Sequence, residues 1–240
     1  MAVIKRTRDT SDPFKIFTVD FDITPTSTAL IIIDMQKHGC CEDIGLGKFW
    51  LENFPERAGY WFSRLHKIVV PNIQNLLAFF RANQLRVIFI RVGPFLPDGS
   101  DMFERRRIRE ETTKRLLGID RLYYLGSLEL EIIDELKPRN GELVIDKNSA
   151  SAFNSTNIDQ LLRNIGIDSL VITGVATNAC VETTARDGAD RGYKCILVED
   201  ACTTIQGQDV HDMTMHNFAT SFGKVMPTSE VLESLLARIK

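Results

Sequence analysis

The chain has 240 residues, which favours one α/β domain over two because domains usually span roughly 100–200 residues. It carries 29 Lys and Arg against 32 Asp and Glu, a formal net charge of −3, and this balance argues against a nucleic-acid binder with a basic stripe. Hydrophobic residues make up 44% and charged residues 25%, ordinary values that exclude a disordered, collagen-like or coiled-coil chain.

Targeting and metal signals are missing from the sequence. No apolar run approaches the roughly 18 residues of a membrane helix, and the first residues, MAVIKRTRDTSDPF, lack a signal-peptide core. We therefore expect a soluble, cytoplasmic protein with no membrane partner. The five cysteines are odd in number and have no CxxC spacing, which disfavours a disulfide framework. The four histidines do not stand at ligand spacing with them, so we expect neither a metal nor a cofactor.

Short β-branched apolar runs alternate with segments of helical periodicity. Strands are predicted at residues 29–33, 87–90, 143–145, 170–173, 195–198 and 224–226, and helices at 68–82, 128–136, 158–164, 179–191, 209–220 and 230–239. This alternation predicts a Rossmann-like three-layer α/β/α sandwich with a mostly parallel sheet of about six strands. We expect a single domain over residues 1–240, with residues 1–26 as an N-terminal extension.

Reactive side chains follow several of the predicted strands. Asp34 follows the first strand, Lys147 follows the third, and Cys180 lies in the turn and helix start after the fourth. Because ligands of open parallel sheets bind outside the carboxyl ends of the strands, these three groups are expected to converge. Arg91 and Asp200, after the second and fifth strands, are expected on the same rim.

Cys180 is a candidate nucleophile. The first turn of a helix has unpaired N–H groups and a positive dipole end, which lower a thiol pKa, and a nearby Lys147 would lower it further. Asp34 would act as general base and then acid, while the backbone N–H groups of Ala176 and Cys180 would hold an oxyanion. Alternatively, Cys180 is a small buried hydrophobe and Asp34 a turn residue.

Three segments carry a family resemblance: ALIIIDMQ, VIDKNSASAF and LVITGVATNACVETTARDGADRGYKCILVEDAC. They resemble the signature regions of the isochorismatase-like cysteine hydrolase family, over most of residues 27–225, and GVATNACVE is the most specific part. The resemblance implies an isochorismatase-like fold and the catalytic triad Asp34, Lys147 and Cys180. It also implies a cis peptide between Val175 and Ala176 that presents the Ala176 amide to the oxyanion.

The family divides by chemistry. Isochorismatases proper lack the nucleophilic cysteine, so Cys180 favours carbon–nitrogen bond hydrolysis. The Asp-x-His metal pattern of nicotinamidases is missing from residues 35–70. Residues 141–202 look most like ureide-cleaving amidohydrolases of the ureidoacrylate amidohydrolase and biuret hydrolase type. The implied reaction is hydrolysis of a small amide, ureide or N-carbamoyl compound through a thioester, releasing ammonia or an amine.

Other residues are candidates for substrate binding. The candidate substrate contacts lie in or beside these motifs and are Gln36, Arg91, Phe153, Thr177 and Asn178. Residues 49–62 hold six aromatic side chains in fourteen, as in a lid, a subunit interface or a satellite hydrophobic cluster. A homo-oligomer, dimer or tetramer, is expected. The four arginines of residues 104–111 would either clamp a substrate carboxylate or form a solvated helix face.

Four rival classes compete with this interpretation. The Cys180 to Arg186 spacing matches cysteine phosphatases, but the stretch is predicted as helix and Glu182 would repel a phosphate. No G-x-G-x-x-G follows a predicted strand, which disfavours a dinucleotide-binding enzyme. A nicotinamidase-like hydrolase and a non-catalytic scaffold of the same fold stay open as alternatives.

The remaining histidines and cysteines have simpler expectations. His211 and His216, on the predicted helix 209–220, are expected at the surface or partly packed. Cys195, inside a strand, is expected in the core, whereas the sequence leaves Cys40, Cys41 and Cys202 open.

Overall fold

The computed structural model describes residues 18–118 and 123–239. The expected N-terminal extension, residues 1–26, lies outside the described residues as far as residue 17. Within the described ranges, six parallel strands form one sheet of order β3-β2-β1-β4-β5-β6, which confirms the predicted α/β class. The strands are β1 (Thr28–Ile33), β2 (Arg86–Val92), β3 (Leu143–Lys147), β4 (Ser169–Val175), β5 (Lys194–Thr203) and β6 (Lys224–Met226).

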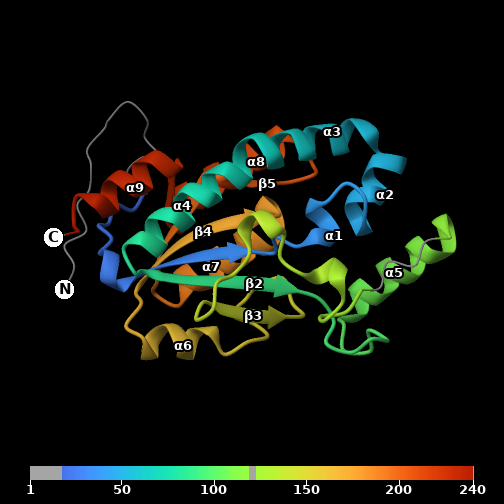
Figure 1. The fold of residues 1–240 in the computed structure, drawn as a ribbon, viewed down its shortest axis with the longest axis horizontal. Helices are drawn as coiled ribbons and strands as arrows, with labels where there is room; N and C mark the ends of the chain where they lie inside the picture. The colour runs from blue at the N-terminus through green and yellow to red at the C-terminus, as the bar shows by residue number, and fades with distance from the viewer. Residues whose placement is uncertain (1–17, 119–122, 240) are drawn as a thin grey trace.

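Helices connect the strands. They are α1 (Lys37–Cys40), α2 (Gly45–Asn53), α3 (Pro55–Arg64), α4 (Val70–Ala82), α5 (Glu104–Leu117), α6 (Ile158–Asn164), α7 (Glu182–Asp190), α8 (Gln208–Ser221) and α9 (Thr228–Leu236). Two π-helical turns, Leu65–Val69 and Thr177–Val181, run directly into α4 and α7. Figure 1 shows the arrows of β1 to β4 pointing toward the end of the molecule where α1, α2 and α5 lie.

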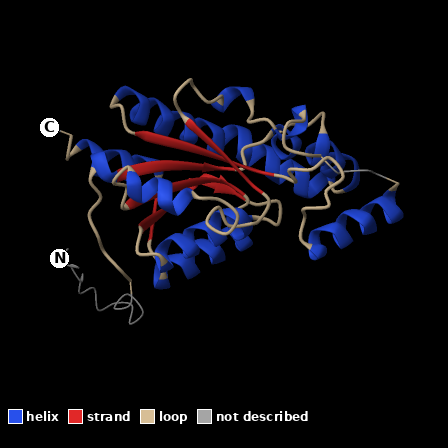
Figure 2. Ribbon diagram, turned by 90° about the horizontal axis from the view of Figure 1, so that it is seen from below, coloured by secondary structure: helices blue, strands red, loops and turns tan. Residues whose placement is uncertain are grey.

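The central strands β1 and β4 are buried on both faces of the sheet, because successive side chains of a strand point to opposite faces and helices cover both. In the central strand β1, Leu30 and Ile32 pack into one cluster, which includes side chains of α3, α4 and α9. The residues between them, Ala29, Ile31 and Ile33, pack into a second cluster with side chains of α6, α7 and α8. Figure 2 shows the resulting three layers, with helices on both sides of the strands.

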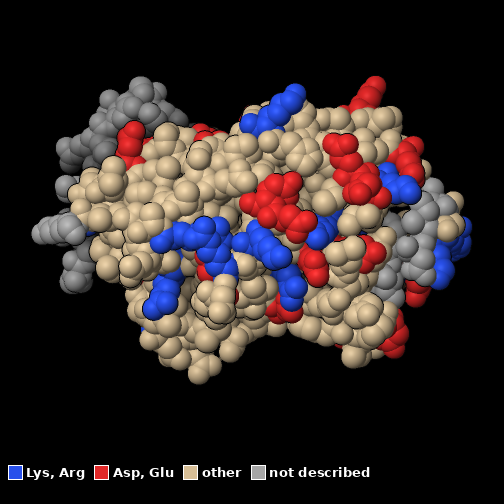
Figure 3. Space-filling view, viewed as in Figure 1, with Lys and Arg blue, Asp and Glu red and all other residues tan. Residues whose placement is uncertain are grey.

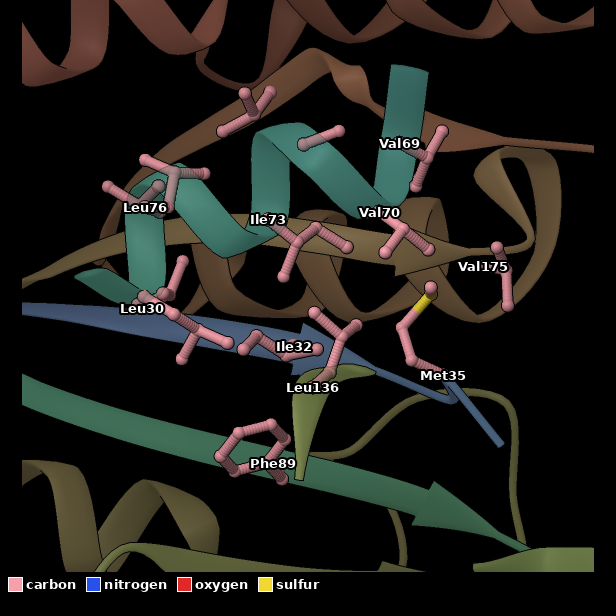
Figure 4. Close-up of a cluster of buried hydrophobic side chains, with 14 of the residues drawn as sticks. Leu30, Ile32, Met35, Val69, Val70, Ile73, Leu76, Phe89, Leu136 and Val175 are labelled. Atoms are coloured by element: carbon pink, nitrogen blue, oxygen red, sulfur yellow. The ribbon is translucent and has the colours of Figure 1, made fainter. Parts of the chain in front are cut away.

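The first cluster extends to the carboxyl edge of the sheet. Figure 4 shows Leu30 and Ile32 of β1 beneath Ile73 and Leu76 of α4. Met35, which follows Asp34, and Val175, which precedes Ala176, both belong to this cluster. Both side chains are buried. The core therefore anchors the chain at the ends of β1 and β4.

One predicted helix is wrong. Residues 128–136 form two short 3-10 turns, Leu128–Leu130 and Asp134–Leu136, instead of a helix. Their backbone is used elsewhere, because the Glu131 carbonyl accepts a hydrogen bond from Lys37 N–H and Ile133 N–H donates to the Met35 carbonyl. These long-range bonds replace the local ones of a helix. The helices α2 and α3 were not predicted.

Charged groups of both signs are mixed on the surface. Figure 3 shows small groups of basic and acidic side chains beside one another on one face of the molecule. None of the helices in the described ranges is long and apolar enough to cross a membrane.

Gly174 provides a test of how closely β1 and β4 approach beside the site. It has φ +108°, and a Cβ atom there would overlap the Ile33 carbonyl oxygen. Gly192 also has positive φ, +88°, but a Cβ atom there would meet open space. We predict that Gly192→Ala lowers the free energy of unfolding by about 1–2 kcal/mol, from backbone strain alone. Gly174→Ala should cost about 3 kcal/mol or more, because overpacking is added to the strain. Urea denaturation measures both, and equal losses would contradict the close approach.

Candidate active site

A cavity of about 430 Å³ opens at the carboxyl edge of the sheet. Its wall combines residues after β1, β3 and β4 with side chains from α2, α3 and α5. The described residues on the wall include Asp34, Gln36, Trp50, Trp61, Arg105, Arg106, Arg109, Glu110, Asn148, Ser149, Ala176 and Cys180. The cavity thus lies where the strand order predicts a ligand site.

Asp34 and Lys147 form a buried ion pair beside this cavity. Lys147 Nζ lies 2.9 Å from Asp34 Oδ2 and also donates to the Ser149 carbonyl at 3.1 Å. Burial raises the pKa of Asp34 above its ordinary value, although the Lys147 charge opposes this. Burial alone would lower the pKa of Lys147, but the Asp34 carboxylate raises it, so the amine is charged. Asp34 Oδ1 is buried without a hydrogen-bond partner among the described residues.

Cys180 lies next to this pair, in the π-helical turn before α7, and lines the cavity. The expectation of a lowered thiol pKa is wrong for this structure. Burial, and then the Asp34 carboxylate, raise the pKa of Cys180 to about 12, and Lys147 only partly compensates. The thiol is therefore neutral at pH 7, with a buried carboxylate beside it as proton acceptor.

The backbone turns sharply between β4 and Cys180. The peptide bond from Val175 to Ala176 is cis, as the family resemblance implies. Ala176 and Cys180 both line the cavity, one before and one within the π-helical turn. The structure thus brings Asp34, Lys147, Cys180 and Ala176 together from three separate strand ends.

Gln36 lines the cavity, but its amide is already occupied. The side chain is buried and bridges two segments, because Nε2 donates to the carbonyls of Val92 and Leu130 and Oε1 accepts from Val92 N–H at 2.8 Å. Its amide therefore joins the end of β2 to the segment after α5 and holds the cavity wall.

Three residues expected on the rim or as substrate contacts lie away from the cavity. Arg91 pairs with Asp146 of the neighbouring strand through bonds of 2.7 and 2.8 Å. Asp200 Oδ1 accepts from the backbone N–H and hydroxyl of Thr228 at the start of α9. Phe153 packs in the second core cluster against Tyr193. None of the three is among the described residues on the cavity wall, so we do not assign Arg91 or Phe153 to substrate binding.

Thr177 and Asn178 also turn away from the cavity. Thr177 Oγ1 lies 2.9 Å from His211 Nδ1, and Asn178 bonds to Gln206 and Thr204. His211 is buried, contrary to expectation, whereas His216 is exposed. Arg64 Nη2 lies 3.1 Å from His211 Nε2. Because arginine only donates, Nε2 of the imidazole accepts from Arg64 and Nδ1–H donates to Thr177 Oγ1. His211 therefore supports the π-helical turn on the side away from the cavity.

The aromatic segment 49–62 spans the second half of α2 and most of α3, and it forms part of the cavity wall. Trp50 and Trp61 line the cavity and meet edge to face, with ring centroids 5.3 Å apart. Trp61 and Phe62 are also buried in the main core cluster, so the segment is no satellite cluster. The arginine run also reaches the cavity, because α5 contributes Arg105, Arg106 and Arg109 to its wall.

Several wall residues were missed by the sequence reasoning. Asn148 and Ser149 line the cavity and directly follow Lys147. Their position just after a predicted strand is the same signal that identified Lys147. His38 and Tyr123 also line the cavity, and no local pattern marks them. The part of the chain that the structure describes holds no cluster of three or more His, Cys, Asp or Glu suited to a metal ion. Cys40, Cys195 and Cys202 are buried.

The phosphatase-like spacing has a different structure. Arg186 lies on α7 and binds Glu182 one turn earlier, with Nη2 2.6 Å from Oε1. Its guanidinium also stacks over Phe222, 4.4 Å from the ring centroid. The stretch is helical and offers no loop to wrap a phosphate.

Comparison with known proteins assigns the family. A family model described as "Isochorismatase domain" matches residues 28–230, and the chain belongs to this family. Ureidoacrylate amidohydrolase of Acinetobacter baylyi is 33% identical over 218 residues, which cover 88% of this chain and 85% of that protein. The crystal structure of a cysteine hydrolase from Pseudomonas syringae pv. phaseolicola superposes with a TM-score of 0.75 at 29% identity, covering 96% of this chain and 100% of that one. N-carbamoylsarcosine amidase from Thermoplasma acidophilum superposes with a TM-score of 0.59 at 25% identity, covering 84% and 96%.

His211 predicts a pH dependence of stability. Burial, and then the Arg64 charge, lower its pKa from 6.5 to about 4. The unfolded chain therefore takes up a proton that the folded chain does not as the pH falls from about 6.5 to 4. This residue should then lower the free energy of unfolding by about 3 kcal/mol across that window. Chemical denaturation at several pH values measures the slope, which should flatten in His211→Gln. The exposed His216→Gln is the control and should keep the wild-type slope.

Proposed function

We propose that this chain hydrolyses a carbon–nitrogen bond of a small amide, ureide or N-carbamoyl compound, with Cys180 as nucleophile. The observation that carries the proposal is the position of Cys180 on the cavity wall, beside the buried Asp34–Lys147 pair. The family and the amidohydrolase relatives agree with a hydrolase that acts on carbon–nitrogen bonds other than peptide bonds.

The first half of the reaction forms a thioester. The Cys180 sulfur attacks the substrate carbonyl carbon while its proton passes to Asp34, so that no free thiolate is needed beforehand. The carbonyl oxygen becomes an oxyanion, held by the N–H groups of Ala176 and Cys180. The carbon–nitrogen bond then breaks as Asp34 returns the proton to the nitrogen, and ammonia or an amine leaves.

The second half releases the acid. Water gives a proton to Asp34 and attacks the thioester carbonyl, the carbon–sulfur bond breaks, and the sulfur regains the proton from Asp34. Lys147 stays charged throughout and holds the carboxylate in place through its 2.9 Å contact. The raised pKa of Asp34 makes it a stronger base than an exposed carboxylate, which suits both proton transfers.

Cys180→Ser tests the nucleophile. Ammonia release should fall by about 10³-fold or more, because a hydroxyl is a far weaker nucleophile than a thiol. Release is measured on a panel of ureides, primary amides including nicotinamide, and N-carbamoyl acids. Cys41→Ser, which changes a cysteine away from the cavity wall, is the control and should leave release unchanged.

Each outcome has a defined meaning. Near-native release from Cys180→Ser would refute the nucleophile, and release from nicotinamide alone would favour a nicotinamidase-like enzyme. No release from any member of the panel would favour the non-catalytic scaffold.

Asp34→Asn separates the base from a structural role. Turnover should fall by about 10²–10⁴-fold, because the proton acceptor is lost. Alkylation of Cys180 by iodoacetamide should instead become faster, because the carboxylate that raises the thiol pKa is removed while Lys147 remains. Mass spectrometry of the alkylated peptide at pH 8 follows this rate in folded protein. Turnover that stays near the wild-type rate in Asp34→Asn would contradict the assignment of Asp34 as base.

A further inference from the structure

Arg106 stands out among the arginines that α5 presents to the cavity. Arg105 stacks over the Phe103 ring, 5.1 Å from its centroid, and Arg109 Nη2 lies 3.8 Å from Glu110 Oε1. The backbone N–H of Arg106 donates to the Phe103 carbonyl, but its guanidinium makes no hydrogen bond or ion pair with any described residue, and its Nε is buried without a partner. A buried donor without an acceptor is costly, so this guanidinium needs an acceptor that the described residues do not supply.

The charges on the cavity wall are unbalanced. The acidic residues that line it, among those described, are Asp34 and Glu110. Asp34 is paired with Lys147, and Glu110 Oε1 lies 3.8 Å from Arg109 Nη2. Burial lowers the pKa of Arg106, and Glu110 opposes this shift, but a guanidinium stays charged. The cavity therefore carries an excess of positive charge on the α5 side.

The position of Arg106 relates this charge to the candidate nucleophile. Arg106, Cys180 and Asp34 all line the same cavity. The surfaces around it are largely apolar, with Trp50, Val92 and Leu130 on the wall. Because Arg106 and Cys180 both line this cavity of about 430 Å³, a single small molecule that fills it contacts both residues.

We propose that Arg106 binds a carboxylate of the substrate, so that the enzyme selects anionic ureido or N-carbamoyl acids over neutral ureides. This inference rests on the proposed function. The guanidinium offers two parallel N–H donors to a carboxylate, while the scissile carbonyl lies at Cys180. A short apolar linker between the two groups occupies the apolar part of the wall.

The test compares two substrates of equal shape. They are 3-ureidopropanoate and (3-methylbutyl)urea, in which two methyl groups replace the carboxylate oxygens, and both release ammonia from the same ureido group. The wild-type enzyme should prefer the anion by about 10–100-fold in kcat/KM, the range of a charge-assisted bidentate contact. High salt should raise KM for the anion and leave the neutral substrate unchanged.

Variants of α5 assign the preference to one residue. Arg106→Gln should abolish it, mainly by raising KM for the anion, with the neutral substrate unchanged within about threefold. Arg106→Lys keeps the charge and should keep part of the preference, which also guards against a folding defect in Arg106→Gln. Arg107→Gln, an exposed neighbour that does not line the cavity, should keep the wild-type preference.

The outcomes separate this inference from the proposed function. Turnover of both ureides with equal kcat/KM, unchanged in Arg106→Gln, would overturn the carboxylate site and leave the cysteine hydrolase standing. If neither ureide is turned over, calorimetric titration of Cys180→Ser decides. Binding of 3-ureidopropanoate at least tenfold tighter than the neutral ureide, lost on adding Arg106→Gln, supports the site. Equal binding, or no binding of the anion, overturns it.

Discussion

The buried contact between Asp34 and Lys147 is the constraint around which the candidate site is arranged. It joins the end of β1 to the end of β3 across the intervening strand β2, over a distance of 2.9 Å. Lys147 has no exposed surface and Asp34 very little, so both charges are largely shielded from bulk water. Removing one member of such a pair usually costs several kcal/mol, because the other charge is left buried. The two strand ends are therefore held in one arrangement.

The surrounding structure holds the Asp34–Lys147 pair in a fixed position relative to Cys180. Met35 and Val175 anchor the chain in the core on either side of the site, as Figure 4 shows. Gln36 ties the same turn to Val92 and Leu130, and the His211 imidazole supports the π-helical turn through Thr177. Rigid support of this kind fixes reacting groups before a substrate arrives.

The cavity has two electrically different sides. On the sheet side, Asp34 and Lys147 neutralise each other next to a neutral thiol, which suits proton transfer within a closed set of groups. On the α5 side, the guanidinium of Arg106 has no described partner and adds a fixed positive charge. In the proposed reaction the first side breaks the carbon–nitrogen bond and the second selects the molecule. These roles come from elements far apart in the sequence.

The sequence by itself determined the alternation of strands and helices and the convergence of Asp34, Lys147 and Cys180. Strand periodicity is local, and parallel strands place their carboxyl ends at one edge, so chain order alone brings these residues together. It did not determine which neighbouring side chains face the cavity. Only the tertiary structure decided this, because Arg91 pairs with Asp146 and Thr177 hydrogen-bonds to His211, and these partners are distant in the chain. The thiol pKa was likewise decided in three dimensions, because burial and the Asp34 charge outweigh the helix start and Lys147.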